Sequence, residues 1–271
     1  FVNAAAYDGN YIFSKTKDAF QIDGYAKEGK DLETLAALYR EAQRIKLYGF
    51  TPGEYDRAKS EYMSVLEKQY TNRDKTKNAY FGDLYRDHFL DNEPIPSIED
   101  NYQIMAQVTP MLPVEMINEY AKQLITDKDS NLVVFIFAQE KEGKTYPSEA
   151  DMASAIKAVR GEKIEAYVDN AKNEPLILPE AMPKAGKIKK ETENKTLGYK
   201  ELTLSNGARV ILKKTDFKAD EILFQAVAQG GNSLYDNKAD FTNLQLLGEV
   251  VGASGLGNFS NTELQKALFG K

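Results

Sequence analysis

His88 is the only histidine of the chain, and its side chain suits both metal binding and acid–base chemistry near neutral pH. A zinc helix of the H-x-x-E-H type needs two histidines four residues apart, so that both imidazoles face one metal ion and a glutamate can act as general base. Here Asp91 occupies the glutamate position, Asn92 the second histidine position, and Pro94 ends the helix soon afterwards. We therefore interpret His88 as a partly buried or surface helix residue without a metal role.

Carboxylate pairs are the other groups that could carry acid–base chemistry. Asp91 with Glu93, and Glu99 with Asp100, fit helix caps and exposed faces, and no spacing marks either pair as a general acid and base. The chain has no cysteine, which excludes thiol catalysis, thiolate metal sites and disulfides. We expect the chain to contain no catalytic and no metal-ligating residue, and its substrate-binding residues stay unknown at this point.

Length and charge narrow the class of protein. The 271 residues suffice for one or two domains, and 42% of them are hydrophobic, which is typical of a globular protein. A net charge of −6 disfavours nucleic acid and anionic membranes as partners, and no run approaches the roughly eighteen apolar residues of a membrane helix. The glycines of Gly252–Gly257 are spaced G-x-x-G-x-G, unlike a nucleotide-binding loop, so we expect a flexible connection there.

Residues 1–169 have the pattern of an α+β domain, in which an antiparallel sheet has helices packed on one side. Tyr11–Phe13 and Phe20–Ala26 predict two short strands, and the apolar run Leu132–Phe137 predicts a third, buried strand. Helices are expected to begin at Asp31, Thr51, Asn78, Ser97, Thr109 and Ser148.

Local start and stop signals support these helices. Gly49 is expected to end the first helix as a C′ residue. In Thr51-Pro-Gly-Glu54, threonine is expected at the N-cap, proline at the first helical position, and glutamate reaching back as a capping box. Further along, the 3.6-residue period is expected to place Met116, Ile117, Tyr120 and Leu124 on a buried face.

A change in composition at residues 170–197 indicates an interdomain linker. Three prolines, followed by the lysine-rich stretch Lys184–Lys195, favour an extended and solvated segment. The run Lys187–Lys190 has no interleaved aromatic residues and is followed closely by Glu191 and Glu193, so a nucleic-acid patch is not expected.

Residues 198–271 have the pattern of the beginning of a second α+β domain. Asn206-Gly207 is a strong hairpin signal, because a type I′ turn needs two residues that tolerate positive φ. Strands are expected on both sides of this turn, and Glu221–Ala228 predicts a third strand that stops at Gly230-Gly231. A helix is expected over Asp240–Val251.

Several of these segments together resemble a known family. The run Leu197–Leu212 resembles the opening of a homology domain in the insulinase/pitrilysin-like zinc peptidases, family M16. The resemblance continues through Phe224–Tyr235, Gly257–Ser260 and Glu263–Lys271. Upstream, the stretches Ala37–Arg44 and Tyr48–Lys59 resemble the second domain of such proteins, where an element G-F-T/S-x-x-E-L-x-x-A-K is found.

The resemblance implies a place for this chain within a larger architecture. Proteins of this family carry four similar α+β domains in two halves, which close around an unfolded peptide. Their zinc motif, H-x-x-E-H with a further glutamate ligand downstream, lies in the first domain. Residues 1–169 would then be a second domain, noncatalytic and truncated at its N-terminus, residues 170–197 the linker, and residues 198–271 the truncated start of a third domain. The helix within Ala239–Val251 has no histidine, so no zinc ligand carries over.

The function that follows from the resemblance is a noncatalytic portion of a zinc metallopeptidase. This chain would form chamber wall and the linker between halves, with zinc implied only for the full-length parent, and with peptide substrate and the parent's remaining domains as partners. Two alternatives stay open: a noncatalytic scaffold or peptide-binding subunit of the same family, and an unrelated α+β interaction module. Because the chain begins at Phe1, we expect an excised internal piece, and we expect an exported, periplasmic bacterial protein.

Overall fold

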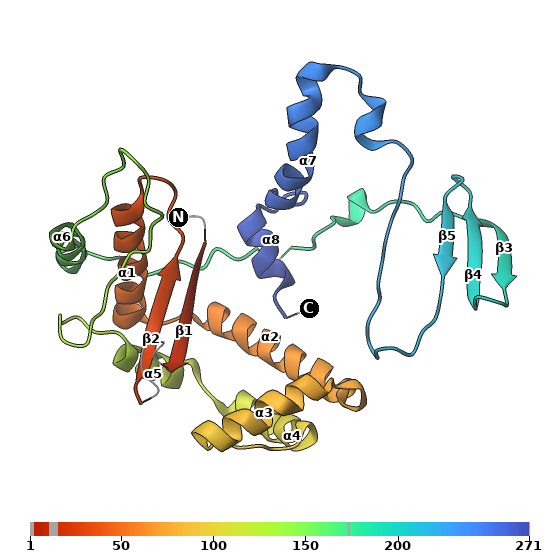
Figure 1. Cartoon of the computed structure of the whole chain (residues 1–271). Helices are drawn as coiled ribbons and strands as arrows, with labels where there is room; N and C mark the ends of the chain where they lie inside the picture. Colours follow the sequence, from red (N-terminus) through yellow and green to blue (C-terminus); the bar gives the residue numbers. More distant parts are fainter. Residues whose placement is uncertain (1–2, 11–15, 173, 271) are drawn as a thin grey trace. The chain divides into compact units, whose positions relative to one another are not determined.

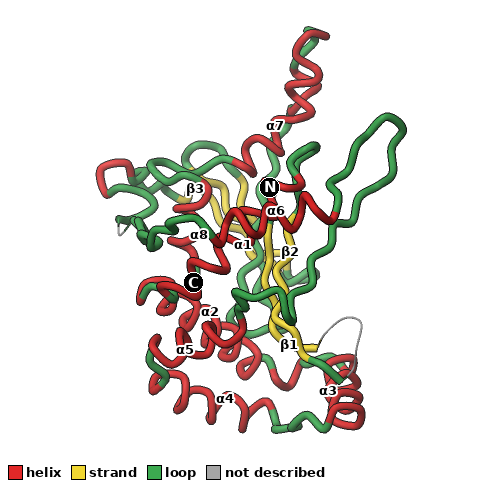
Figure 2. The backbone as a smooth tube through the Cα atoms, turned by 90° about the vertical axis from the view of Figure 1, so that its left-hand side faces the viewer, coloured by secondary structure: helices red, strands yellow, loops and turns green. Residues whose placement is uncertain are grey.

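The computed structural model describes residues 3–10, 16–172 and 174–270 and shows an α+β chain with two small antiparallel sheets (Figures 1 and 2). It divides into two compact units. The first comprises Phe1–Asp56 with Pro110–Asn170, and the second comprises Arg57–Thr109 with Ala171–Lys271. The α+β class expected from the sequence is confirmed, whereas the proposed domain limits at residues 169 and 197 remain a prediction.

The first unit combines a two-stranded sheet with three helices. Strand β1 (Ala4–Asn10) pairs antiparallel with β2 (Asp18–Gly24). Helix α1 (Asp31–Tyr48) contacts β2 and also packs against α5 (Val114–Leu124) and α6 (Glu149–Arg160). Strand β2 agrees with the prediction for its segment, whereas the predicted strand Tyr11–Phe13 lies outside the described residues.

The core of the first unit lies between α1 and α6. Tyr39, Ile156, Val159 and Ile164 form one buried apolar cluster, and Val159 at its centre is only 1% exposed. Leu35, Ala36 and Leu132 pack against this cluster and are partly buried. Helix α6 begins with a capping box in which Ser148 and Asp151 exchange hydrogen bonds, so its apolar stripe starts in a fixed position.

The connection from α1 to α2 (Pro52–Thr71) follows the predicted signals closely. The Thr51 backbone N–H donates to the Glu54 carboxylate at 2.9 Å, and Thr51 Oγ1 accepts from the Glu54 N–H at 3.3 Å. Gly49 follows α1 with φ of 71° and ψ of −170°, a backbone conformation open mainly to glycine. Asn118 of α5 then holds the turn, since it accepts from the Phe50 N–H at 2.7 Å and donates to the Phe50 carbonyl at 3.2 Å.

The second unit holds most of α2, the helices α3 (Asn78–Asp91) and α4 (Ile98–Val108), and the C-terminal elements. Its second sheet has the order β3–β4–β5, and two helices follow the sheet in the sequence. Their bounds are β3 (Ile188–Asn194), β4 (Tyr199–Leu204), β5 (Arg209–Leu212), α7 (Phe241–Ala253) and α8 (Asn261–Leu268).

The predicted hairpin at Asn206-Gly207 is confirmed, but its turn type is not. β4 pairs antiparallel with β5, and Gly207 has φ of 87°. Asn206 is not among the residues with positive φ, so the turn is not type I′. Instead, the Asn206 side chain accepts a hydrogen bond from the Ala208 N–H at 3.0 Å, which stabilises the turn locally.

Two predicted strands are wrong, because a strand needs an adjacent strand with which its backbone can form hydrogen bonds. Leu132–Phe137 and Glu221–Ala228 belong to no strand. Phe137 is 81% exposed, and Ile222 is 94% exposed. Apolar, β-branched sequence predicts a strand that is buried in a sheet, and among the described residues no ladder forms for either segment.

Two further expectations are corrected. The basic half of the predicted linker is not simply extended and solvated, since it forms β3, where backbone pairing with β4 and a Lys200–Glu191 ion pair at 2.9 Å hold it. Of the four residues expected on a buried face, Ile117 and Leu124 are half-buried, whereas Met116 and Tyr120 are exposed by more than half and do not face inward. The Tyr120 hydroxyl donates to an Asp8 carboxylate oxygen at 2.5 Å, so its ring remains at the surface.

Substituting Gly49 by alanine should destabilise the chain more than substituting Gly29. Both glycines have positive φ, 71° and 72°, so alanine carries a backbone penalty at either position, and the ψ of −170° makes that penalty about 1–3 kcal/mol at Gly49. A Cβ on Gly49 would lie 2.4 Å from the Asn118 side chain, whereas a Cβ on Gly29 meets nothing within 4 Å. Urea unfolding of Gly49→Ala and Gly29→Ala measures the difference, and equal losses would contradict the role assigned to Asn118.

Candidate functional site

His88 lies exposed in the last turn of α3, and its ring is used locally. Its Nδ1 is 2.7 Å from the carbonyl oxygen of Glu93, to which it must donate because a carbonyl only accepts. Asn92 ends the helix in the left-handed region, with φ of 58° and ψ of 29°, and its N–H donates to the His88 carbonyl at 3.0 Å. The imidazole therefore helps to terminate α3.

The residues around His88 do not fit a zinc centre. Zinc sites in proteins use three or four nitrogen, sulfur or oxygen ligands. In the part of the chain that the structure describes, no group of three histidine, aspartate or glutamate side chains lies together in a way that could hold a metal ion. That the chain contributes no metal ligand and no catalytic residue nevertheless stays a prediction, to be tested by metal analysis.

The carboxylate pairs singled out by the sequence are exposed, and one of their members is a helix cap. Asp100 accepts from the Ser97 hydroxyl at 2.7 Å and donates its backbone N–H to Ser97 Oγ at 3.0 Å. Glu99 is exposed in the first turn of the same helix, α4. The local geometry gives these groups a role in starting α4.

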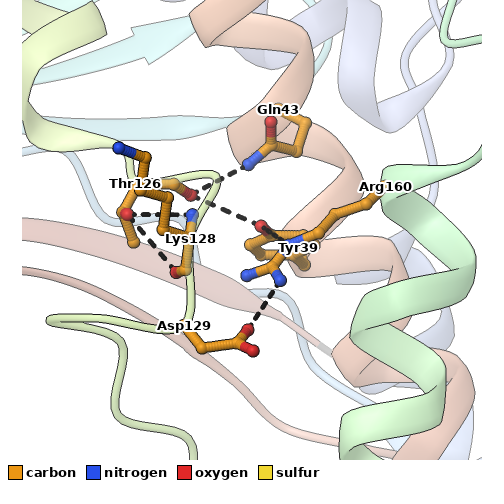
Figure 3. Close-up of polar contacts among 6 residues, drawn as sticks. All are labelled: Tyr39, Gln43, Thr126, Lys128, Asp129 and Arg160. Carbon is orange, nitrogen blue, oxygen red and sulfur yellow. Dashed lines mark hydrogen bonds and ion pairs between the residues drawn. The ribbon is translucent and has the colours of Figure 1, made fainter.

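One polar arrangement in the first unit joins three separate segments (Figure 3). Tyr39 and Gln43 project from α1, Arg160 is the last residue of α6, and the strip Thr126–Asp129 follows α5. The Thr126 carbonyl accepts from the Tyr39 hydroxyl at 3.3 Å and from Gln43 Nε2 at 3.2 Å. Two buried side chains of one helix therefore hold the same carbonyl.

Arg160 completes this arrangement from the other side. Its Nε donates to the Tyr39 hydroxyl at 2.9 Å, and its Nη1 donates to the Asp129 carboxylate at 2.6 Å. The guanidinium carbon lies 5.6 Å from the centre of the Tyr39 ring. The hydrogen bond to Tyr39 and then the one to Asp129 raise the pKa of Arg160 above its ordinary value. Because the Tyr39 hydroxyl both accepts and donates here, the arrangement positions chain segments.

A second set of contacts ties α1 to the segment after α6. Arg40 forms a bidentate pair with Glu162, at 2.5 and 2.8 Å, and this hydrogen-bonded pair holds the pKa of the Glu162 carboxyl below its ordinary value. The Tyr48 hydroxyl donates to the Ile164 carbonyl at 2.8 Å. Sequence reasoning missed these residues, because the partners are more than a hundred positions apart and no local spacing links them.

Comparison with known proteins gives two related zinc proteases. The chain is 28% identical over 225 residues to a protein of Arabidopsis thaliana named "Zinc protease PQQL-like", a match that covers 83% of this chain and 23% of the relative. It is 27% identical over 243 residues to the "Probable zinc protease PqqL" of Escherichia coli, covering 89% of this chain and 25% of the relative. The chain thus spans about a quarter of the length of these curated relatives. No protein-family profile matches it.

Solved structures show a more distant likeness. The periplasmic protease PqqL from Escherichia coli matches with a TM-score of 0.44 at 22% identity, over 91% of this chain and 26% of that one. The ferredoxin protease FusC, solved as a mutant in complex with Arabidopsis ferredoxin, matches with a TM-score of 0.41 at 12% identity, over 79% of this chain and 23% of that one. Separately, none of the helices described is long and apolar enough to cross a membrane.

Replacing Tyr39 by phenylalanine should lower the free energy of unfolding by about 1–2 kcal/mol, because the Arg160 Nε and the Thr126 carbonyl each lose a partner. Chemical denaturation followed by circular dichroism measures the loss. Tyr25→Phe is the matched control, since Tyr25 is 71% exposed, and it should change little. Equal effects of the two substitutions would remove the support for a positioning role of Tyr39.

Glu162→Gln should lower the free energy of unfolding at neutral pH. It should also make that free energy less dependent on pH in the acid range. The folded-state pKa of Glu162 is lowered below 4.5, so its stabilising effect is complete above that value and is lost as the pH falls through the folded pKa. The difference between parent and variant should therefore shrink as the pH falls below 4.5. Glu165→Gln serves as control, because only the backbone carbonyl of Glu165 contacts Arg44. A difference that is constant with pH argues against the Arg40 pairing.

Proposed function

The chain is related to zinc proteases of the M16 family, and from that relationship we propose that it forms a noncatalytic part of a peptide-hydrolysing metallopeptidase. In this proposal residues 1–169 and 198–271 contribute to the wall of a closed chamber, and residues 170–197 link its two halves. The zinc and the residues that activate water would belong to the full-length parent. The observation that carries the proposal is the alignment with two zinc proteases over more than four-fifths of the chain.

The chemistry of the chain supports a noncatalytic role. One histidine and no cysteine leave too few ligands for the two-histidine zinc helix of a metallopeptidase. His88 also donates its Nδ1 hydrogen to the Glu93 carbonyl, which restrains the ring in the last turn of α3. Catalysis by the parent would then require ligands from elsewhere, while this chain shapes the space around the peptide.

The proline-bearing part of the segment between the proposed domains, before β3, has the properties of a semi-rigid spacer. It contains three prolines, each of which fixes φ at about −65°: Pro175, Pro179 and Pro183. The second of them begins a single 3₁₀ turn, Pro179–Ala181. Most side chains of this segment are exposed. Such a spacer limits the range of distances between the elements that it joins, as a linker between two closing halves must.

The accessible surface supports the remaining domains of the parent as partners. Large apolar side chains are open to solvent in the second unit: Phe89, Ile222 and Phe224 are each exposed by more than four-fifths. Other parts of the same protein would cover such side chains, and a peptide substrate would contact only the chamber side.

A second candidate function is a noncatalytic scaffold or peptide-binding subunit of the same family. The single histidine favours it as much as it favours the first proposal. The two are separated by the sequence of the complete gene: an H-x-x-E-H motif supports the peptidase, and its absence supports the scaffold. We further propose export to the periplasm, as the family resemblance of the sequence implies.

Purified residues 1–271 should hold zinc far below one ion per chain and should not cleave unfolded peptides. Mass spectrometry with plasma ionisation measures bound zinc after dialysis against a zinc-containing buffer. His88→Ala is the matched variant, and it should bind the same trace amount as the parent. One zinc per chain that disappears in His88→Ala would overturn the proposal, because this part would then carry a metal centre of its own.

A further inference from the structure

The tip of the β4–β5 hairpin carries the only Asn-Gly pair of the sequence, Asn206-Gly207. Both residues are exposed, and a Cβ built on Gly207 would meet nothing within 4 Å, so no other part of the described chain crowds the Gly207 backbone. Glycine has no side chain to shield its amide nitrogen, and its backbone reaches more conformations than that of any other residue. Attack of this nitrogen on the Asn206 carboxamide carbon would close a five-membered ring.

Two hydrogen bonds at the turn act on the reacting atoms in opposite directions. The Ala208 N–H donates to Asn206 Oδ1 at 3.0 Å, which polarises the carboxamide and stabilises negative charge on that oxygen during an attack. The Gly207 N–H donates to the Leu204 carbonyl at 3.0 Å, which holds the attacking nitrogen in the hairpin. The first bond is local to the turn and survives a brief opening of the hairpin, whereas the second depends on the pairing of β4 with β5.

We propose that Asn206 is a site of spontaneous covalent modification, at which the carboxamide is lost as ammonia. Strand β5 has only four residues and lies at the edge of its sheet, so local opening frees the Gly207 N–H without unfolding the unit. The inference goes beyond the proposed function and does not depend on it.

The reaction needs only water and hydroxide as co-reactants. The Gly207 nitrogen gives its proton to hydroxide and attacks Cγ of Asn206. A C–N bond forms, the bond from Cγ to Nδ2 breaks, and Nδ2 takes a proton from water and leaves as ammonia. Water then opens the resulting succinimide at one of its two carbonyls, which gives aspartate or isoaspartate. Nothing is oxidised or reduced.

The two products should affect the hairpin differently. Aspartate keeps the length of the backbone and a carboxylate oxygen that can accept from the Ala208 N–H. Isoaspartate adds one methylene to the main chain between Leu204 and Ala208, where the Leu204 N–H donates to the Ala208 carbonyl at 2.8 Å. That bond closes the hairpin, so isoaspartate would release β5 from β4.

Asn237 offers an internal control. It is exposed, and its Oδ1 accepts from the Ala239 N–H at 3.1 Å, which repeats the local geometry at Asn206. The residue that follows it is Lys238, and its Nδ2 also donates to the Asp240 carboxylate at 2.9 Å. Lys238→Gly separates these two differences, because it changes only the residue that supplies the attacking nitrogen.

The chain of residues 1–271 is incubated folded at mildly alkaline pH, and its proteolytic peptides are followed by mass spectrometry, which detects the exchange of –NH2 for –OH. Asn206 should convert about tenfold faster than Asn237, because glycine follows it. Lys238→Gly should raise the rate at Asn237, and Asn206→Gln should stay unmodified, since its longer side chain would need a six-membered ring.

Two results would overturn the proposal. One is an equal rate at Asn206 and Asn237 in the parent chain. The other is conversion of Asn206 that appears only after unfolding in urea, because the folded turn would then protect the residue.

Trypsin measures the release of β5, because cleavage after Arg209 requires the backbone of this strand to leave β4. The isoaspartate fraction, separated by chromatography, should be cut there faster than the parent chain. Asn206→Asp should be cut at the parent's rate, since it keeps the backbone length. Equal rates for the isoaspartate fraction and Asn206→Asp would contradict the effect assigned to isoaspartate.

Discussion

The first unit depends on the contact between α1 and α6, two helices that are far apart in the sequence. Val159 and Ile156 of α6 bury the ring of Tyr39, and the hydroxyl of the same ring holds Arg160 and the Thr126 carbonyl. Tyr39 therefore contributes both buried apolar surface and directional hydrogen bonds to the contact between the two helices. Loss of the helix contact would release the strip after α5 and the Arg40–Glu162 pair together, because both are held by the same pair of helices.

Local features of the fold could be predicted from the sequence, because their physics involves neighbouring residues. The capping box of Thr51 and Glu54 and the N-cap Ser148 lie where their spacing placed them, as does the glycine conformation at Gly49. The hairpin at Asn206-Gly207 was also predictable, although only Gly207 has a positive φ. At Asn206 the side chain instead accepts a local, Asx-type hydrogen bond. In each case the partner lies within a few positions.

Long-range features could not be predicted in the same way. Tyr39 and Arg160 are 121 positions apart, and no pattern in the sequence connects them. Glu221–Ala228 has the composition of a strand but no strand beside it among the described residues, while Ile188–Asn194 has a linker's composition and pairs with β4. Sheet formation depends on which partner is available as much as on propensity. The candidate site follows the same rule, since His88 was found from its type alone and the Tyr39–Arg160 arrangement only from the structure.

The interleaving of the two units in the sequence has a consequence for synthesis. The first unit is built from residues on both sides of Arg57–Thr109, so its core closes only after α6 has been made. Loop closure over such a separation is slow compared with local helix formation. On the ribosome, α1 would therefore stay without its main partner while α2, α3 and α4 form. The apolar face of α1 would meanwhile be open to chaperones.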